Sequence, residues 1–368
     1  MSEHTGPDFE RVRTALLLQG EPDRVPLAEI GAHPAIKKAV LGRSVISPAD
    51  DVDFWVKAGY DFVAWPVGMV SVLMIPDPQR RGRVPSIAKD IHRAAKAKYS
   101  VLDDQEAEKL WAEEGKGVIT TLEELESFNW PTADDFDYSV LEAVANCLPQ
   151  GMKIIPFTIG YFAPAYFLMG AETVFMSLYD DPGLVEKVME KVGNIELGIL
   201  ERLMKYDFVG AVWITDDIAY SDNLMISPKH LRRYLFPWFK RATEICRKNG
   251  RPVIYHSDGK LYDVLGDLID CGFNAIHAIE PKAMDIVYLK KTVGDRLCLI
   301  GNIDLAYTLT LGKPEEVIEE TKQRLRDVAP GGGYCVSSSN SIPEYVPIAN
   351  YNAMRETVLK YGTYPISI

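Results

Sequence analysis

The chain has 368 residues, of which 47% are hydrophobic and 25% are charged, an ordinary composition for a globular protein. Its formal net charge of −12 works against binding a phosphate backbone, so we expect no nucleic-acid partner. No apolar run approaches the ~20 residues that a membrane helix needs, and the polar, acidic N-terminus predicts a cytoplasmic protein.

Short apolar segments rich in β-branched residues recur along the chain, with helical segments between them. In chain order they span residues 24–31, 60–67, 151–158, 210–217, 251–258, 273–281, 296–304 and 332–340. Helices are expected at 182–205, 228–249 and 314–328, each of which begins with proline. Apolar strands that alternate with helices are typical of a parallel sheet, and eight such units predict an α/β fold, the (β/α)8 TIM barrel. A doubly wound sheet would need a glycine-rich fingerprint after the first strand, which "EIGAHPAIKK" does not provide.

The interval between the second and third expected strands is too long for one crossover. We interpret residues 68–150 as an insertion that forms a lid or hairpin over the mouth of the barrel, with a solvated surface decoration as the alternative. The whole chain, 1–368, is then expected to be a single barrel domain.

Polar and ionisable side chains follow nearly every expected strand. Because a barrel of this kind carries its chemistry at the carboxyl ends of its strands, these side chains are candidates for an active site. They are Glu29, His33, Asp61, Asp216, Asp217, His256, Asp258, Glu280, Asn302, Asp304, Ser337, Ser338, Ser339 and Asn340. Singly, each could cap a helix or lie in a turn. Together they favour an active site, since so many acids near one point are costly unless they bind something. We expect His256, Asp258, Asp216 and Asp217 to be catalytic.

Aromatic and thioether side chains accompany these polar groups and could form the wall of a pocket for a mostly apolar, aromatic ligand. The residues expected to bind substrate are Trp65, Met69, Phe157, Tyr161, Tyr166, Asn302 and Asn340. Filling of the core is the alternative for the apolar members.

Several stretches of the chain resemble the uroporphyrinogen decarboxylase superfamily. They include "GYFAPAYFLMG", "RPVIYHSDGKLYDVLGDLIDCGF", "CLIGNIDLAYT" and "GGGYCVSSSNSIP", and the likeness runs from about residue 24 to residue 361. The resemblance implies a (β/α)8 barrel with one of two chemistries. One is cofactor-free decarboxylation of uroporphyrinogen, and the other is zinc-dependent methyl transfer to or from a corrinoid protein.

The chain departs from both branches of that superfamily. The arginine-rich segment that receives the porphyrinogen carboxylates should follow the first strand, where this chain reads "AEIGAHPAIKKAV". In the thiol-acting methyltransferases, H-x-C-G follows the fifth strand and a cysteine lies in the loop after the eighth. Here Asp258 and Asn340 stand at the two cysteine positions. Oxygen donors in place of thiolates make a harder centre, suited to an ether oxygen.

The combined reading predicts a methyltransferase that takes a methyl group from a small methoxylated, aromatic substrate and passes it to a corrinoid protein. Zinc would be held by His256, Asp258 and Glu280, and the corrinoid would be supplied by the partner. The alternatives left open are a metal-free decarboxylase of a small aromatic or tetrapyrrole acid and a non-catalytic binding barrel. The sequence does not fix the oligomeric state, for which a homodimer is one option.

Overall fold

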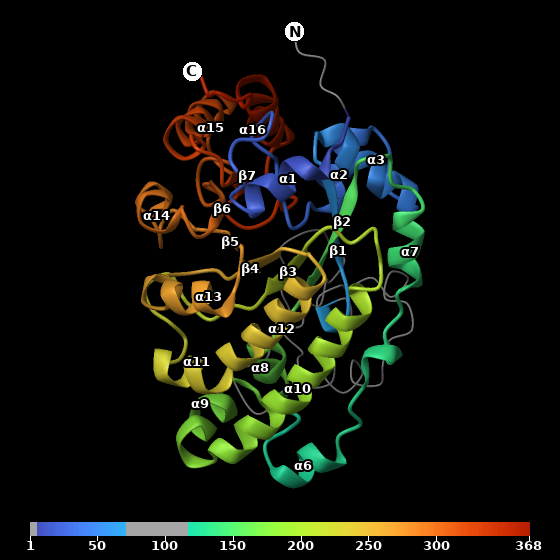
Figure 1. The fold of residues 1–368 in the computed structure, drawn as a ribbon, viewed down its shortest axis with the longest axis vertical. Helices are drawn as coiled ribbons and strands as arrows, with labels where there is room; N and C mark the ends of the chain where they lie inside the picture. Colours follow the sequence, from blue (N-terminus) through green and yellow to red (C-terminus); the bar gives the residue numbers. More distant parts are fainter. Residues whose placement is uncertain (1–5, 71–116) are drawn as a thin grey trace.

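The computed structural model describes residues 6–70 and 117–368, and its centre is one parallel sheet (Figure 1). Seven strands lie side by side in chain order: β1 (Phe62–Pro66), β2 (Lys153–Thr158), β3 (Val212–Thr215), β4 (Val253–His256), β5 (Ala275–His277), β6 (Cys298–Ile303) and β7 (Tyr334–Ser338). Every neighbouring pair is parallel. All residues of β4, β5, β6 and β7 are buried, as expected for a sheet that is covered on both faces.

The first expected strand, residues 24–31, is not a strand in the structure. It lies beside β7 through single bridges, with the Ala28 amide donating to the Val336 carbonyl at 2.8 Å and the Val336 amide donating to Pro26 at 2.9 Å. Pro26 has no amide hydrogen to donate, so it interrupts a regular ladder. Among the described residues no bridge joins this segment to β1. The prediction of eight strands is therefore corrected to seven strands and one bridged segment.

Helices separate the strands and cover the sheet. They are α1 (Phe9–Leu16), α2 (Pro34–Leu41), α3 (Pro48–Ala58), α6 (Leu122–Ser127), α7 (Ser139–Ala145), α8 (Phe162–Met169), α9 (Ala171–Asp180), α10 (Pro182–Leu203), α11 (Pro228–Tyr234), α12 (Phe236–Lys248), α13 (Leu265–Cys271), α14 (Ile286–Val293), α15 (Pro314–Val328) and α16 (Ile348–Tyr361). The short 3-10 turns are η2 (Ala133–Asp135) and η3 (Tyr262–Val264). Several of the α-helices begin with a capping side chain followed by proline. Ser47, Asp181 and Ser227, for example, each accept a hydrogen bond from the first turn.

The helix expected over 228–249 is two helices, α11 and α12, which meet at Leu235. Pro237 lies in the first turn of α12, and its ring and missing amide hydrogen do not allow a continuous helix through this point. A single helix was predicted because Pro228 marks a first turn and Gly250 follows the last residue of the stretch.

The interval from 68 to 150 is described only in part. Its described helices lie on the outside of the molecule, where α7 packs on α3 and η2 packs on α10 (Figure 1). Residues 71–116 lie outside the described part, so the lid or hairpin over the barrel mouth stays a prediction.

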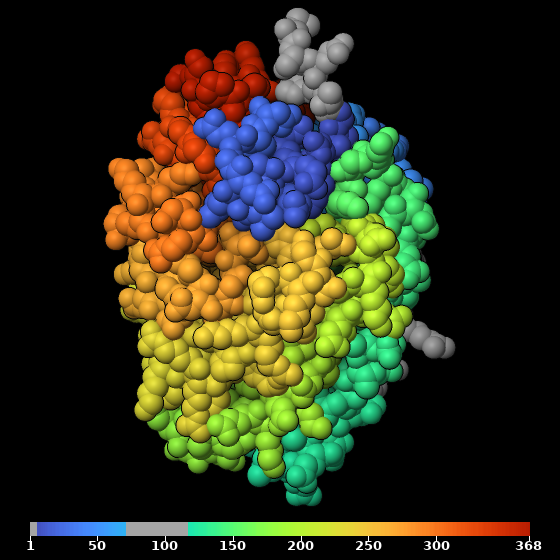
Figure 2. All heavy atoms as spheres, in the orientation of Figure 1, coloured from blue at the N-terminus to red at the C-terminus, as the bar shows by residue number. Residues whose placement is uncertain are grey.

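The two ends of the described chain meet on one side of the molecule. The first residues, in blue, lie against the C-terminal helices, in red (Figure 2), and a bridge pairs Arg24 with Thr363. Within the described ranges, none of the helices combines the length and the apolar character needed to cross a membrane.

Candidate functional site

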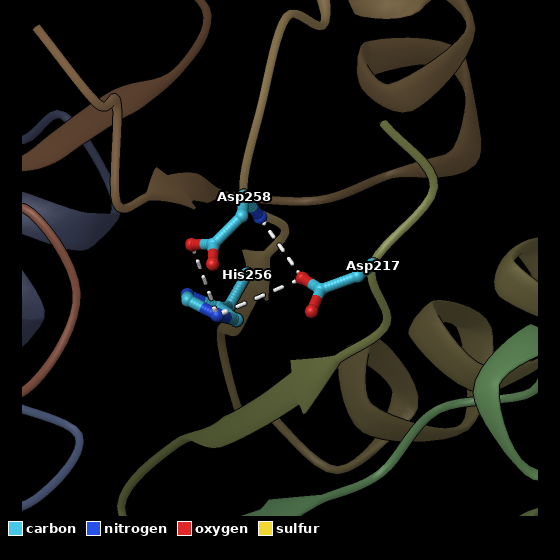
Figure 3. Close-up of side chains that lie close together, drawn as sticks. All are labelled: Asp217, His256 and Asp258. Carbon is cyan, nitrogen blue, oxygen red and sulfur yellow. Dashed lines mark hydrogen bonds and ion pairs between the residues drawn. The ribbon is translucent and has the colours of Figure 1, made fainter. Parts of the chain in front are cut away.

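Strand pairing brings three segments of the site together at the carboxyl ends of β3, β4 and β5. Thr215, His256 and His277 are the last residues of these strands and lie in register with one another. Asp217 follows β3 by two residues, and Asp258 follows β4 by two residues. Figure 3 shows the imidazole of His256 with the two carboxylates facing it from the neighbouring loops.

The distances within this group are longer than direct hydrogen bonds from the imidazole. His256 Nε2 lies 3.9 Å from Asp217 Oδ1 and 3.8 Å from Asp258 Oδ1. One ligand atom from each residue lies within 4.8 Å of the others. The loop itself is ordered by the Asp258 amide, which donates to Asp217 Oδ1 at 2.9 Å. The amide nitrogen of Asn340, which follows β7, donates to both oxygens of Asp258 at 2.9 and 3.0 Å.

The site is electrostatically acidic. Burial raises the pKa of Asp258 to about 6, an effect that His256 opposes and that Asp217 and Glu280 reinforce. Lys282 Nζ lies 3.7 Å from Glu280 Oε1. An acid-rich cluster of this kind is stabilised by an added cation.

The donor set fits a zinc ion by its chemistry and spacing. Imidazole nitrogen and carboxylate oxygen are both zinc ligands, and donors bonded at ~2.1 Å to a tetrahedral ion lie roughly 3.4 Å apart. The 3.8 and 3.9 Å separations are therefore close to those of a metal site and too long for hydrogen bonds. His256, Asp258 and Asp217 are the residues that could hold the ion. Glu280 is not a member of this group of donors, so its predicted role as a ligand stays a prediction.

His277 belongs to the site, although the sequence reading did not single it out. Its Nδ1 lies 2.7 Å from Nδ1 of His256, and its Nε2 lies 3.2 Å from Ser337 Oγ. The ring is buried and packs edge-on against Trp213, with 4.8 Å between centroids. The position of His277 at the end of a strand, like that of His256, could have identified it. The apolar residues around it in the sequence instead suggested a core residue.

Glu29 is a buried acid that contacts Ser338 of β7. It is fully buried, and its two oxygens accept from the amide and hydroxyl of Ser338 at 2.6 and 2.9 Å. Burial raises the pKa of Glu29 to about 8, and its hydrogen bonds oppose the rise. The neighbouring residue Ser337 is the one whose hydroxyl contacts His277.

Asp216 and Asp217 are adjacent in sequence but lie in different surroundings. Asp216 is buried, and both of its oxygens accept backbone amides at the start of α8, from Tyr161, Phe162 and Ala163 at 2.8, 2.9 and 2.8 Å. Burial raises its pKa to about 7, against the effect of these bonds. This geometry ties β3 to α8, and it is Asp217 that faces His256. The predicted catalytic role of Asp216 is not supported by this arrangement and stays untested.

The residues expected to bind substrate are dispersed. Trp65 and Phe157, on the neighbouring strands β1 and β2, are partly exposed, and Met69 is buried. Tyr161 is buried against Trp238 and Phe239 of α12. Its ring therefore occupies the helix layer.

The side chains of Tyr166 and Asn302, also predicted to bind substrate, contact other parts of the chain. Tyr166 packs in α8 among Phe162, Phe167 and Phe175. The Asn302 side chain donates to the Ile279 carbonyl at 2.8 Å and accepts from Arg324 at 2.9 Å. Among the predicted substrate residues, Asn340 is hydrogen bonded to Asp258, which lies beside His256.

Comparisons with known proteins agree with this architecture. Residues 115–361 match the model of the family described as Uroporphyrinogen decarboxylase (URO-D). The chain is 30% identical over 141 residues to a Methylcobamide:CoM methyltransferase, MtaA, of Methanosarcina barkeri, an alignment of 38% of this chain and 39% of that protein. It is 26% identical over 192 residues to a uroporphyrinogen decarboxylase of Coxiella burnetii (strain Dugway 5J108-111), which covers 50% of each chain. The chain thus spans only about two fifths to one half of these relatives.

A solved structure shares the fold over nearly the whole length. A methyltransferase from Methanosarcina mazei superposes with a TM-score of 0.68, covering 95% of this chain and 98% of that one, at 17% sequence identity. The resemblance inferred from sequence is confirmed, and the chain belongs to the uroporphyrinogen decarboxylase family.

Proposed function

We propose that this protein is a methyltransferase that removes a methyl group from a small methoxylated, aromatic substrate and passes it to a corrinoid protein. The observation that carries the proposal is the convergence of His256, Asp217 and Asp258, a nitrogen and oxygen donor set without thiolate, in a family barrel. A similarity to a methylcobamide methyltransferase supports the methyl-transfer class.

The donor set bears on which substrate atom is activated. When bound, a zinc ion on imidazole and carboxylate ligands would act as a Lewis acid toward the ether oxygen. Thiolate ligands suit thiol substrates, whereas oxygen ligands make a harder centre. The replacement of both family cysteines, by Asp258 and Asn340, therefore favours an ether over a thiol.

The reaction breaks the bond between the methyl carbon and the ether oxygen, and the electron pair of that bond stays on the oxygen. The methyl carbon passes to the corrinoid of the partner protein, which enters as a co-substrate. The residues of this chain must stabilise the negative oxygen that leaves. As a zinc ligand Asp258 would be deprotonated, with Asn340 holding its carboxylate in place, and a zinc ion, when bound, would stabilise the leaving oxygen.

The apolar side of the pocket is assigned to Phe157, which is partly exposed and in register with Trp213 on the face of His256, whereas Trp65, in register with Pro156, points to the other face and stays a prediction. Tyr161, predicted as a substrate residue, is left out because its ring packs on α12. The cytoplasmic location and the homodimer stay predictions.

A decarboxylase is the second candidate, because the family includes that activity and Asp258 could protonate a carbanion. The same acids argue against it. A substrate carboxylate would meet Asp217, Asp258 and Glu280, and like charges in a partly desolvated pocket repel one another. This candidate predicts release of carbon dioxide from aromatic acids without metal.

Two measurements test the proposal. The first is the zinc content of freshly purified protein by plasma emission, for which we expect about one ion per chain. We expect almost none in His256→Ala, and an unchanged content in the control His230→Ala, whose ring packs between Tyr179 and Tyr234 on the outer helices. Zinc near zero in the unaltered protein would remove the metal from the proposal.

The second measurement is methyl transfer from a panel of methoxylated aromatics to a reduced corrinoid protein, followed by the change in corrinoid absorption. His256→Ala should abolish the change, and His230→Ala should retain it. Carbon dioxide release from the matching aromatic acids, with no methyl transfer from any ether, would favour the decarboxylase instead.

A further inference from the structure

Asn302 is buried near the end of β6, and its side-chain amide joins two elements that are distant in sequence. Its Nδ2 donates to the Ile279 carbonyl at 2.8 Å, and its Oδ1 accepts from Arg324 Nε of α15 at 2.9 Å. A guanidinium can only donate and a carbonyl can only accept, so each end of the amide has the partner that fits it. The amide is therefore fixed in one orientation by the protein itself.

The carbonyl that accepts from Asn302 belongs to a residue with an unusual backbone conformation. Ile279 follows β5 and has a φ of 58°, in the left-handed region that β-branched side chains rarely adopt. Such a conformation persists only where the surrounding structure enforces it. The ends of β5 and β6 are in close backbone contact, since a Cβ at Gly301 would lie 2.4 Å from the Ala278 carbonyl oxygen. The hydrogen bond from Asn302 therefore lies where it opposes relaxation of Ile279 to an ordinary conformation.

The backbone of Ile279 sets the direction of Glu280, which contacts the loop that carries Asp258. Glu280 Oε2 accepts from the Gly259 amide at 2.8 Å. Gly259 directly follows Asp258, whose own amide donates to Asp217 Oδ1 at 2.9 Å. These two contacts fix successive amides of the loop, and with them the backbone from which the Asp258 carboxylate extends.

We propose that Asn302 is a positioning residue that holds Ile279 in the left-handed conformation, with Arg324 fixing the orientation of its amide. Glu280 is thereby kept on the loop of Asp258. This role differs from the predicted contact with substrate and agrees with the 1% exposure of Asn302. The inference rests on the proposed function only for what Asp258 binds. The arrangement of the two loops is a property of the protein before any ligand binds.

The first test is amide hydrogen exchange of metal-free protein, followed by mass spectrometry. Asn302→Asp keeps an acceptor for Arg324 but has no hydrogen to donate to Ile279. We expect exchange to become about tenfold faster in residues 257–264 and 278–285, the loops after β4 and β5. Arg324→Lys is a milder variant that keeps the charge, and it should give a smaller increase in the same two loops.

The matched control is Asn350→Asp. Asn350 is also a buried asparagine, and its Nδ2 donates to the carbonyls of Leu309 and Gly312 at 3.0 and 2.8 Å. A general loss of stability would affect the two aspartate variants alike, whereas only Asn302→Asp should change the loops after β4 and β5. Equal exchange of these loops in the two variants would overturn the inference.

A double-mutant cycle with Ile279→Gly tests the step through the backbone. Glycine adopts a positive φ without steric cost, so position 279 would no longer need to be held. We expect Asn302→Asp to speed exchange about tenfold in the unaltered background and less than about threefold in the Ile279→Gly background. The same increase in both backgrounds would contradict the inference.

Zinc affinity, measured by competition with a chelating dye, separates this inference from the proposed function. Loss of the support behind a metal ligand typically weakens binding ~10–100-fold, and we expect about tenfold for Asn302→Asp and little change for Asn350→Asp. Faster exchange in Asn302→Asp, with no zinc bound by the unaltered protein, would support the inference and count against the proposed function. Zinc binding and loop exchange that Asn302→Asp both leaves unchanged would overturn the inference and leave the proposed function intact.

Discussion

Two clusters of acids lie at opposite ends of the sheet, and they differ in burial and in where their counter-charge comes from. At the amino end, just before β1, Asp61 is fully buried and contacts Arg11, while Arg24 Nη2 lies 3.1 Å from both of its oxygens. Arg11 also bonds Asp23 at 2.7 Å. At the carboxyl end, Asp217 and Asp258 face a single imidazole at 3.9 and 3.8 Å.

The comparison distinguishes acids that stabilise the fold from acids that could bind a ligand. A buried carboxylate that the chain itself pairs with guanidinium groups has its full set of partners and contributes to folding only if the pairing stays intact. Burial raises the pKa of both Asp61 and Asp258, but Arg24 and Arg11 oppose the rise at Asp61, whereas Asp258 faces one imidazole and gains most from a cation that binds from solution. The same residue type should therefore respond oppositely to the same substitution at the two ends.

The largest effect on stability is expected from Asp61→Asn. This change leaves the buried Arg24 guanidinium without its carboxylate and Arg11 with Asp23 alone, which we expect to lower the free energy of unfolding by about 3–5 kcal/mol. The measurement is urea unfolding of metal-free protein. The control is Asp134→Asn, which breaks a surface ion pair with Arg202 and should cost less than about 1 kcal/mol. Equal losses in the two variants would remove the contrast between the clusters.

Glu29→Gln tests a buried acid that has no cationic partner among its described contacts. Its folded pKa of about 8 lies above the ordinary 4.5, so the folded state binds a proton that the unfolded state has released. The free energy of unfolding should therefore fall as pH rises from 5 to 8, by about 2–4 kcal/mol from this group, at ~1.4 kcal/mol for each unit of pKa difference. In Glu29→Gln this decline should be absent, whereas the exposed control Glu123→Gln should keep it. Parallel pH curves for Glu29→Gln and the unaltered protein would refute the raised pKa.

The smallest effect on stability is expected from Asp258→Asn. The variant loses a carboxylate that is repelled by Asp217 and Glu280, and its side chain is 35% exposed, so the free energy of unfolding of zinc-free protein should rise by about 1 kcal/mol or less. Zinc affinity should fall at least tenfold, as measured by competition with a chelating dye. A loss of stability as large as that of Asp61→Asn would show that Asp258 is a structural acid.

The strand pattern was predictable from sequence because it depends on local composition. Seven of the expected segments coincide with β1 to β7, since apolar, β-branched runs between capped helices have few other favourable conformations. The predictions that failed involve proline. Pro26 leaves its segment with bridges only, and Pro237 divides the helix expected over 228–249. Each of these two prolines changes the backbone conformation without changing the hydrophobic pattern of the sequence.

The site was predictable where it follows from the end of a strand. Asp217, His256 and Asp258 were expected to meet because parallel strands end at one edge, and they do meet. Asp216 and Asp217 could not be told apart, because successive side chains point to opposite sides and the sequence does not say which side faces α8. The contact of His277 with His256 was not predicted, because it depends on the register of β4 with β5.

The amino-acid sequence by itself determined the family, the parallel strand order and the presence of an acidic, imidazole-containing edge. Only the tertiary structure decided which acids are neutralised by arginine, which one caps α8, and which histidine stands behind His256. The physical reason is the range of the contacts. Composition and periodicity act over a few residues, whereas the hydrogen bond from Ser338 to Glu29 joins positions 309 apart and exists only after the sheet has formed.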